Sequence, residues 1–180
     1  MLLKLGVAVA LIATLTVGIV TWRRDAPLKD YMNAQVSFKY PKDYSEQTKA
    51  RATKYSEPQI KLGVQSPLSI IELNKEKGAI IAANITKSPF LDTLEKNASR
   101  ALPVNYPNYS KISTQRIQIT GRDIALYKFS YTGKDKQTTL YMSFFIIPSD
   151  NDAYYLYVQS TDKSRWQNDT KIIQDSLQLK

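Results

Sequence analysis

The sequence predicts an α+β fold, in which a mainly antiparallel β-sheet is covered by helices and one transmembrane helix precedes the domain. Three observations support this class. A segment near the N-terminus carries no charge over the length of a membrane span. Many short segments alternate apolar and polar residues with the period of two typical of half-buried strands. Two longer segments repeat apolar residues at three- and four-residue steps, as amphipathic helices do, and the order strands, helix, strands, helix predicts the α+β class.

The N-terminal segment is the first element. No residue from Leu5 to Trp22 is charged, and a helix rising about 1.5 Å per residue over this length crosses most of a hydrocarbon core of about 30 Å. Trp22, followed by Arg23 and Arg24, is typical of an interfacial anchor. We therefore expect an uncleaved membrane anchor at residues 1–24.

Removal as a signal peptide is the alternative, although the small-residue cleavage pattern is poorly met here. A lipid anchor on cysteine is excluded, because the chain has no cysteine. Basic residues flank the segment with Lys4 before it and Arg23, Arg24 and Lys29 after it, which by the positive-inside rule favours a cytoplasmic domain. The imbalance is small and the α-amino group adds charge to the short side. We expect a single-pass protein of the cell membrane with an extracytoplasmic C-terminal domain.

The segment 25–34 is polar with one proline and predicts a linker, so the globular domain is expected at residues 35–180. Val36, Phe38 and Tyr40 alternate on one face of a strand that Pro41 ends. Three further short runs rich in β-branched residues are bounded by proline, glycine or charged turns. These predicted strands lie at 60–64, 68–73 and 78–85.

A change of period predicts a helix at 88–102. Ser88 can cap it and Pro89 suits its first position, while Leu91, Leu94, Ala98 and Leu102 share one side. The period of two then returns, and turns rich in glycine, aspartate and asparagine separate the segments. This pattern predicts an antiparallel meander with strands at 111–120, 123–132, 138–148 and 153–160.

A second helix is predicted at 162–179, where Trp166, Thr170, Ile173 and Leu177 form one stripe and Thr161 or Asp162 is the cap. On the strand before it, Tyr155 and Tyr157 point away from the face of Tyr154. Packing inside a sheet covered on both faces accounts for these tyrosines. A ligand-binding surface at Tyr155 and Tyr157 is the alternative.

Composition excludes several kinds of chemistry. The chain has no cysteine and no histidine, which excludes thiol nucleophiles, catalytic triads with histidine and zinc sites built from these residues. We predict no catalytic, cofactor or metal site. The net charge is +9, which favours polyanions or anionic lipid without selecting between them. The basic residues that we consider in this role include Lys49, Arg51, Lys54 and Lys61.

The order of several motifs resembles the PsbP-like family. These motifs are "FKYPKDY", "GRDIALYKFSYT", "AYYLYVQS", "RW" and "IIQDSLQL", and the resemblance covers about Gln35 to Leu179. It implies the α-β-α sandwich that this family shares with the Mog-type Ran-binding proteins and the bacterial envelope protein DcrB. Family members are photosystem II subunits or assembly helpers, or membrane-tethered envelope proteins, so the resemblance implies binding without catalysis. The chain has no plastid transit peptide, lipobox or histidine, which departs from the photosynthetic type.

These observations predict a membrane-tethered, extracytoplasmic, non-catalytic domain that binds an envelope or membrane protein or assists its assembly. A basic domain that binds anionic lipid or a polyanion is the alternative, and a carboxylate-dependent hydrolase is a remote one. No specific nucleic acid is expected as a partner. The candidate interaction residues are Tyr155, Tyr157, Arg165, Lys49, Arg51 and Lys54.

Overall fold

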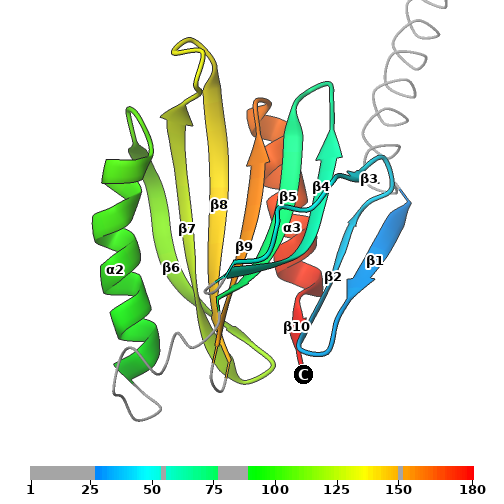
Figure 1. Cartoon of the computed structure of the whole chain (residues 1–180), viewed down its shortest axis with the longest axis vertical. Coiled ribbons are helices and arrows are strands. Elements are labelled where there is room, and N and C mark those ends of the chain that lie inside the picture. The colour runs from blue at the N-terminus through cyan, green and yellow to red at the C-terminus, as the bar shows by residue number, and fades with distance from the viewer. Residues whose placement is uncertain (1–26, 54–55, 77–88, 150–151) are drawn as a thin grey trace, which may run out of the picture.

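The strands and helices of the computed structural model follow the predicted order (Figure 1). The structure describes residues 27–53, 56–76, 89–149 and 152–180. The predicted membrane anchor at 1–24, the predicted strand at 78–85 and Lys54 lie outside the described residues. Of the two helices in the described part, neither has the length and apolar character that a membrane span requires.

Two antiparallel sheets form the fold. The small sheet has the order β1-β2-β10, with β1 (Leu28–Met32), β2 (Val36–Pro41) and β10 (Gln178–Leu179). The large sheet has seven strands in the order β3-β4-β5-β9-β8-β7-β6. Its strands are β3 (Ser45–Glu46), β4 (Ser56–Val64), β5 (Ser69–Glu76), β6 (Ser110–Ile119), β7 (Arg122–Thr132), β8 (Thr139–Pro148) and β9 (Ala153–Ser160).

The predicted four-strand meander is confirmed, because β6, β7, β8 and β9 pair antiparallel in sequence order. Its tightest connection is the two-residue turn between β6 and β7. Thr120 and Gly121 both have positive φ there, 51° and 75°, as the turn that matches the strand twist requires. β5 then pairs with β9, so a strand from before the first helix completes the centre of the sheet.

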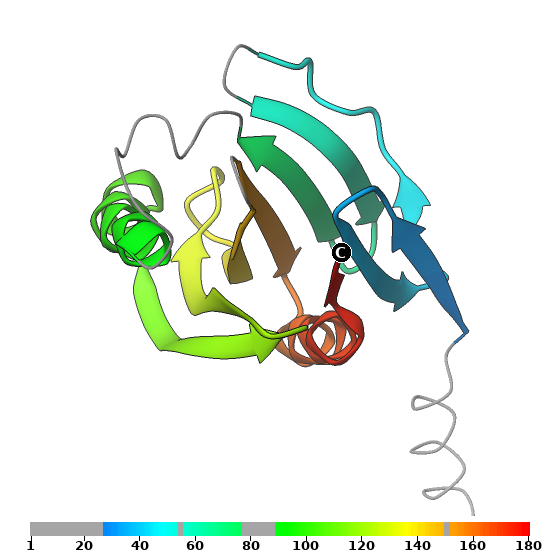
Figure 2. The ribbon, with the colours of Figure 1, turned by 90° about the horizontal axis from the view of Figure 1, so that it is seen from below.

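Helices lie on opposite faces of the large sheet, and each face has its own apolar cluster (Figure 2). On β9, Tyr154, Leu156 and Val158 belong to the cluster beneath α3 (Lys163–Ser176). Tyr155 and Tyr157 pack against the cluster beneath α2 (Pro89–Asn105). The predicted division of this strand into two faces is therefore confirmed, and Tyr155 and Tyr157 are half-buried on theirs.

The first helix, α2, covers β6, β7 and β8 on one face of the large sheet. It does not extend over β9 and β5 on that face. Its apolar side consists of Phe90, Leu91, Leu94 and Leu102. Arg116 of β6 forms ion pairs with Asp92 and Glu95 of the helix, and the Tyr127 hydroxyl of β7 donates to the Glu95 carbonyl at 3.1 Å. These contacts hold α2 over β6, β7 and β8.

The second helix, α3, closes the opposite face. Asp162 is its N-cap and accepts a hydrogen bond from the Arg165 amide at 3.0 Å, as one of the two predicted caps should. Trp166 is 2% exposed and stacks on Tyr141 with ring centroids 5.6 Å apart. The predicted role of Trp166 as the anchor of this helix in the core is confirmed.

Two parts of the sequence prediction are corrected by backbone pairing. Residues 28–32, predicted as linker, form β1. The strand is held mainly by its backbone pairing with β2, so its side chains need no strong apolar alternation. The last helix ends at Ser176 and not at 179, because residues 178–179 pair with β2 as β10. Leu177 stays buried as the last member of the predicted stripe.

Candidate functional site

A row of tyrosines lines the part of the large sheet that α2 leaves uncovered. Tyr155 and Tyr157 stand on β9, Tyr131 lies at the end of β7, and Tyr106 follows α2. All four side chains are half-buried and pack against the α2 cluster. With the polar side chains of the same face, they form what we call the tyrosine face. It consists of Tyr106, Tyr131, Tyr155, Tyr157, Glu72, Asn74 and Gln159.

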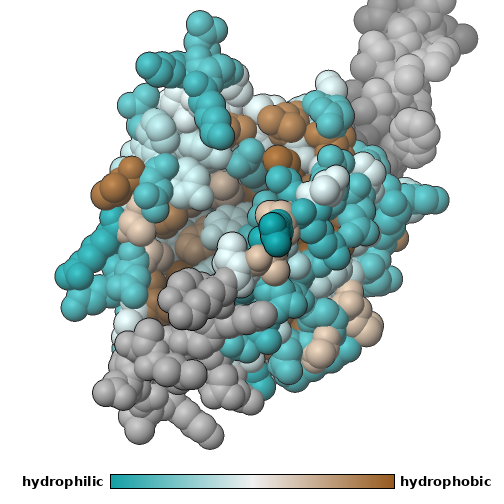
Figure 3. All heavy atoms as spheres, viewed as in Figure 1, coloured by the Kyte–Doolittle hydropathy of each residue, from teal (hydrophilic) through white to brown (hydrophobic). Residues whose placement is uncertain are grey.

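Strand register explains why these residues meet. β5 and β9 pair with Glu72 opposite Tyr157 and Asn74 opposite Tyr155, and residues opposite each other in a ladder share a face. Because α2 lies over β6, β7 and β8, the side chains of β9 and β5 on this face lie beside the helix and are half-buried. Figure 3 looks onto this face and shows it hollowed between α2 and β5.

Aromatic contacts hold the rings of the tyrosine face in place. Tyr157 stacks on the buried Phe144 of β8, with ring centroids 4.8 Å apart and an interplanar angle of 13°. Tyr155 also contacts Phe144, at 5.5 Å. Tyr106 and Tyr131 meet edge to face at 4.7 Å. Such pairs are favourable arrangements of aromatic quadrupoles, so the face presents rigid rings rather than mobile side chains.

The phenol groups stay protonated on this face. Burial raises the pKa of Tyr157, and the nearby Tyr106, Glu72 and Glu76 raise it further. Burial likewise raises the pKa of Tyr155, with a hydrogen bond to Glu76 as the second cause. Their hydroxyls are therefore neutral hydrogen-bond donors at physiological pH.

Hydrogen bonds and an ion pair hold the other polar side chains of the tyrosine face in place. The Tyr131 hydroxyl donates to Gln159 Oε1 at 2.7 Å, and burial raises the pKa of Tyr131 to about 12. Asn74 donates to Glu72 Oε1 at 2.8 Å, and Glu72 is also 3.9 Å from the ammonium of Lys61. The face therefore combines aromatic surface with ordered donors and acceptors, as protein-binding surfaces rich in tyrosine do.

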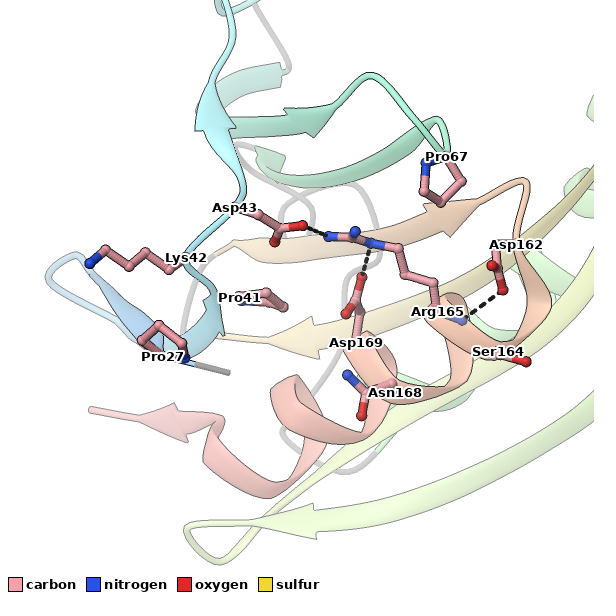
Figure 4. A pocket seen from close by; sticks show the side chains of 10 residues that line it. All are labelled: Pro27, Pro41, Lys42, Asp43, Pro67, Asp162, Ser164, Arg165, Asn168 and Asp169. Carbon is pink, nitrogen blue, oxygen red and sulfur yellow. Dashed lines mark hydrogen bonds and ion pairs between the residues drawn. The ribbon is translucent and has the colours of Figure 1, made fainter. Parts of the chain in front are cut away.

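A pocket of about 820 Å³ lies elsewhere, at the start of α3 (Figure 4). Its walls come from α3, the end of β2, the segment after β2 and the turn between β4 and β5. The lining residues are Pro27, Pro41, Lys42, Asp43, Pro67, Asp162, Ser164, Arg165, Asn168 and Asp169. We call it the α3 pocket.

Arg165 is the central cation of the α3 pocket. Its guanidinium is 2.7 Å from Asp43 Oδ2 and 3.3 Å from Oδ2 of the buried Asp169. The same guanidinium lies over the Tyr44 ring, 5.0 Å from the centroid, and the Tyr44 hydroxyl donates to Asp169 at 2.6 Å. The group therefore joins α3 to the segment after β2 by charge-assisted bonds.

The electrostatics of this group suit a structural role. Burial raises the pKa of Asp169, against the hydrogen bond from Tyr44 and the charge of Arg165, which lower it. The Asp169 carboxylate is buried, and it is held by the Tyr44 hydroxyl and the Arg165 guanidinium. No group of three or more residues that could hold a metal ion occurs within the described residues.

The structure does not bring all the predicted interaction residues together. Tyr155 and Tyr157 lie on the tyrosine face, whereas Arg165 lies on the opposite side of the sheet in the α3 pocket. Lys49 and Arg51 are exposed in the segment after β3, where Lys49 is 3.4 Å from Glu46. A role in binding stays a prediction for each of these residues.

Sequence reasoning missed Tyr106, Tyr131 and Glu72 as members of the tyrosine face. A signal for Tyr131 was present, because it alternates with Phe129 on the face that also carries Tyr127. Tyr106 comes after the helical pattern ends, and Glu72 joins the face only through the pairing of β5 with β9. Neither position has a local sequence signal.

Comparisons with known proteins concern the fold. No family model and no curated protein matches the chain. LpqN of Mycobacterium tuberculosis, involved in cell envelope biogenesis, superimposes with a TM-score of 0.54 and 14% sequence identity, covering 89% of this chain and 96% of LpqN. Cyanobacterial PsbP (CyanoP) from Synechocystis sp. PCC 6803 gives a TM-score of 0.50 and 10% identity, covering 86% of this chain and 94% of CyanoP. The chain therefore has the fold of the PsbP-like and LpqN proteins, as the sequence resemblance predicts.

Proposed function

We propose that the chain is a membrane-tethered, extracytoplasmic binding domain that does not catalyse a reaction and that binds an envelope or membrane protein or assists its assembly. The tyrosine face carries this proposal, because it is the rigid, aromatic and partly open surface of the described domain. The fold in common with LpqN, a protein of cell envelope biogenesis, supports the cell envelope as the place of action. The uncharged N-terminal segment supports the tether.

Aromatic side chains suit a protein partner for physical reasons. A tyrosine offers a large contact area while losing little conformational entropy, and its hydroxyl can bond a partner's backbone. On this face the entropy is already lost before binding, because Tyr157 and Tyr155 pack on Phe144 and the Tyr131 hydroxyl is bonded to Gln159. Binding to rings held in this way avoids an ordering cost.

The test is photo-crosslinking in intact cells with the full-length chain. A photoreactive phenylalanine analogue replaces Tyr157 on the tyrosine face or, as the control, Gln167, which is exposed on α3 at the other side of the sheet. We expect the analogue at Tyr157 to capture one recurrent membrane or envelope protein that the analogue at Gln167 does not capture. Protease added outside the cells should also degrade the domain.

Two results would contradict the proposal. Equal capture from both positions would show that the tyrosine face has no preferred partner. A domain that stays protected when protease also has access to the outer side of the cytoplasmic membrane would place it in the cytoplasm. A further variant, Tyr157→Ala, should reduce capture by an analogue placed at Tyr155, while Tyr157→Phe, which keeps the ring on Phe144, should retain most of it.

A further inference from the structure

Several turns lie at one end of the domain, together with the point where the chain enters it. Strand register places the turn 65–68, the turn 133–138 and the start of α3 at the same end of the large sheet. Pro27, the first described residue, lines the α3 pocket together with Pro67 and Ser164. The chain therefore enters the domain at this end, which we call the Pro27 end and which includes all these segments.

Exposed apolar side chains gather at the Pro27 end. The large hydrophobic residues that are at least 42% exposed in the described part are Leu28, Met32, Leu68, Val104 and Ile112. Leu28 follows Pro27, and Leu68 follows Pro67 of the pocket wall. Val104 and Ile112 flank the connection from α2 to β6, and the Pro107 carbonyl of this connection accepts a bond from the Thr132 amide at the end of β7. Of the five, Met32 alone lies away from this end, because it is the last residue of β1.

Exposed lysines surround these apolar side chains. The lysines of the Pro27 end are Lys42, Lys134, Lys136 and Lys163. None of them forms an ion pair with another described residue. The end thus offers free ammonium groups beside apolar tips, which is the pattern of surfaces that bind anionic bilayers.

The acids of the same end are exposed but already have hydrogen-bond donors within the domain. Asp135 accepts hydrogen bonds from the Gln137 and Thr138 amides of its own turn. Asp162 caps α3, and Asp43 pairs with Arg165. Because these carboxylates already have donors, the lysines are the charged groups of this end that have no partner among the described residues.

Chain length brings the Pro27 end to the bilayer. Pro27 comes five positions after Trp22, the predicted interfacial residue, and five extended steps of the chain reach at most about 18 Å. The polar headgroup layer itself is roughly 5–8 Å thick on each side of the hydrocarbon core. A domain tethered this closely must hold its entry point beside the headgroups.

We propose that the Pro27 end rests on the surface of an anionic lipid bilayer, with Leu28 and Leu68 among the headgroups and the lysines against the phosphates. This inference rests on the tether of the proposed function. The strands of the large sheet then run along the membrane normal, and the tyrosine face opens sideways toward a neighbouring membrane protein. The tyrosine face would accordingly bind its partner close to the bilayer, at a distance no greater than the height of this domain.

The chain has no cysteine, so one introduced cysteine can carry an environment-sensitive fluorophore. The full-length chain is reconstituted into vesicles of phosphatidylcholine with phosphatidylglycerol, labelled either as Leu68→Cys at the Pro27 end or as Gln118→Cys. Gln118 is exposed on β6 beside the turn at the other end of the sheet. We expect blue-shifted emission and several-fold weaker quenching by iodide for the label at position 68, and emission typical of water for the label at position 118.

Vesicle flotation separates the tether from the bilayer contact. Protein that floats with the vesicles while both labels are equally quenched keeps the tether and overturns the contact. Protein that does not float overturns both. If the label at position 68 is shielded equally in pure phosphatidylcholine, the occupant is not an anionic surface and the proposal is wrong.

A charge variant tests the lysines without disturbing the fold. Lys134→Glu combined with Lys163→Glu changes two exposed residues, and a glutamate in the first turn of α3 is favourable to the helix dipole. We expect this variant to float normally but to lose most of the blue shift at position 68 in anionic vesicles. An unchanged shift would contradict the role of the lysines.

Discussion

Replacing Tyr44 by phenylalanine removes a single hydroxyl from a buried carboxylate and leaves the ring in place. Tyr44 is 1% exposed, its hydroxyl donates to Asp169 Oδ2 at 2.6 Å, and its ring carries the guanidinium of Arg165. Burial raises the pKa of Tyr44 and the charge of Asp169 raises it further, so the hydroxyl remains a donor at every pH at which the domain is studied.

The expected cost follows from the charge of the acceptor. A hydrogen bond to an ionised group contributes about 1.5–3 kcal/mol, because loss of the donor leaves the charge buried and less well solvated. The Arg165 guanidinium still pairs with Asp169, at 3.3 Å, so the carboxylate is not left alone. We expect Tyr44→Phe to lower the free energy of unfolding by about 2 kcal/mol at neutral pH.

The cost depends on pH in a defined direction. Burial raises the pKa of Asp169 above 3.8, although the Tyr44 hydroxyl and Arg165 lower it. A carboxyl group with a raised pKa binds more protons folded than unfolded, so stability falls as pH rises from the unfolded pKa through the folded one. Without the Tyr44 hydroxyl the pKa of Asp169 rises further and this loss extends to higher pH. The penalty of Tyr44→Phe is therefore smaller below the unfolded pKa than at neutral pH.

Urea unfolding of both proteins at neutral and acidic pH measures the two penalties. Tyr40→Phe is a control from β2, the strand just before Tyr44. The hydroxyl of Tyr40 makes no hydrogen bond within the described residues, so we expect a change within about 0.5 kcal/mol. A Tyr44→Phe penalty no larger than that of the control, or one equal at both pH values, would refute the role assigned to the Tyr44–Asp169 bond.

Three further predictions concern the core and the tyrosine face. Trp166→Ala should lower the free energy of unfolding by about 3–5 kcal/mol, as loss of a large buried ring does; calorimetry showing less than about 1 kcal/mol would contradict its burial. Ser143→Ala removes the hydrogen-bond partner of the buried Thr170 hydroxyl, 2.8 Å away, and should lower the free energy of unfolding by about 1–3 kcal/mol. Adding Thr170→Val should restore much of this loss, as urea unfolding of the double variant would show. Burial raises the pKa of Tyr131 from 10.0 to about 12. The phenol therefore contributes stability that is present below pH 10.0 and lost as pH rises toward 12. Tyr131→Phe should reduce that alkaline loss in a pH series of unfolding curves.

Regular hydrophobic patterns made most of the fold predictable. The four-strand meander and both helices follow from periods of two and of three to four residues, because each of these elements buries one or two continuous faces. β1 and β10 were missed for the opposite reason. Their backbone bonds with β2 hold them in place, and backbone pairing leaves no mark on side-chain pattern.

The candidate site was predictable in part. Alternation along β9 placed Tyr155 and Tyr157 on one side of the strand, as the structure confirms. Sequence could not show that α2 stops short of β9 and β5, since that depends on where the Arg116 ion pairs and the apolar side of α2 hold the helix. Which face of β9 stays partly open is therefore a tertiary property.

By itself, the sequence determined the α+β class, the order of the meander and the helices, the burial of Trp166 and the absence of cysteine and histidine chemistry, because these depend on local pattern and composition. The tertiary structure alone decided which distant residues meet. It joined β5 to β9, so that Glu72 lies opposite Tyr157, and it placed Arg165 between Asp43 and the buried Asp169. It also gathered Leu28, Leu68 and the lysines around the entry point of the chain. Such contacts depend on strand register and helix placement, which are set by the packing of the whole domain.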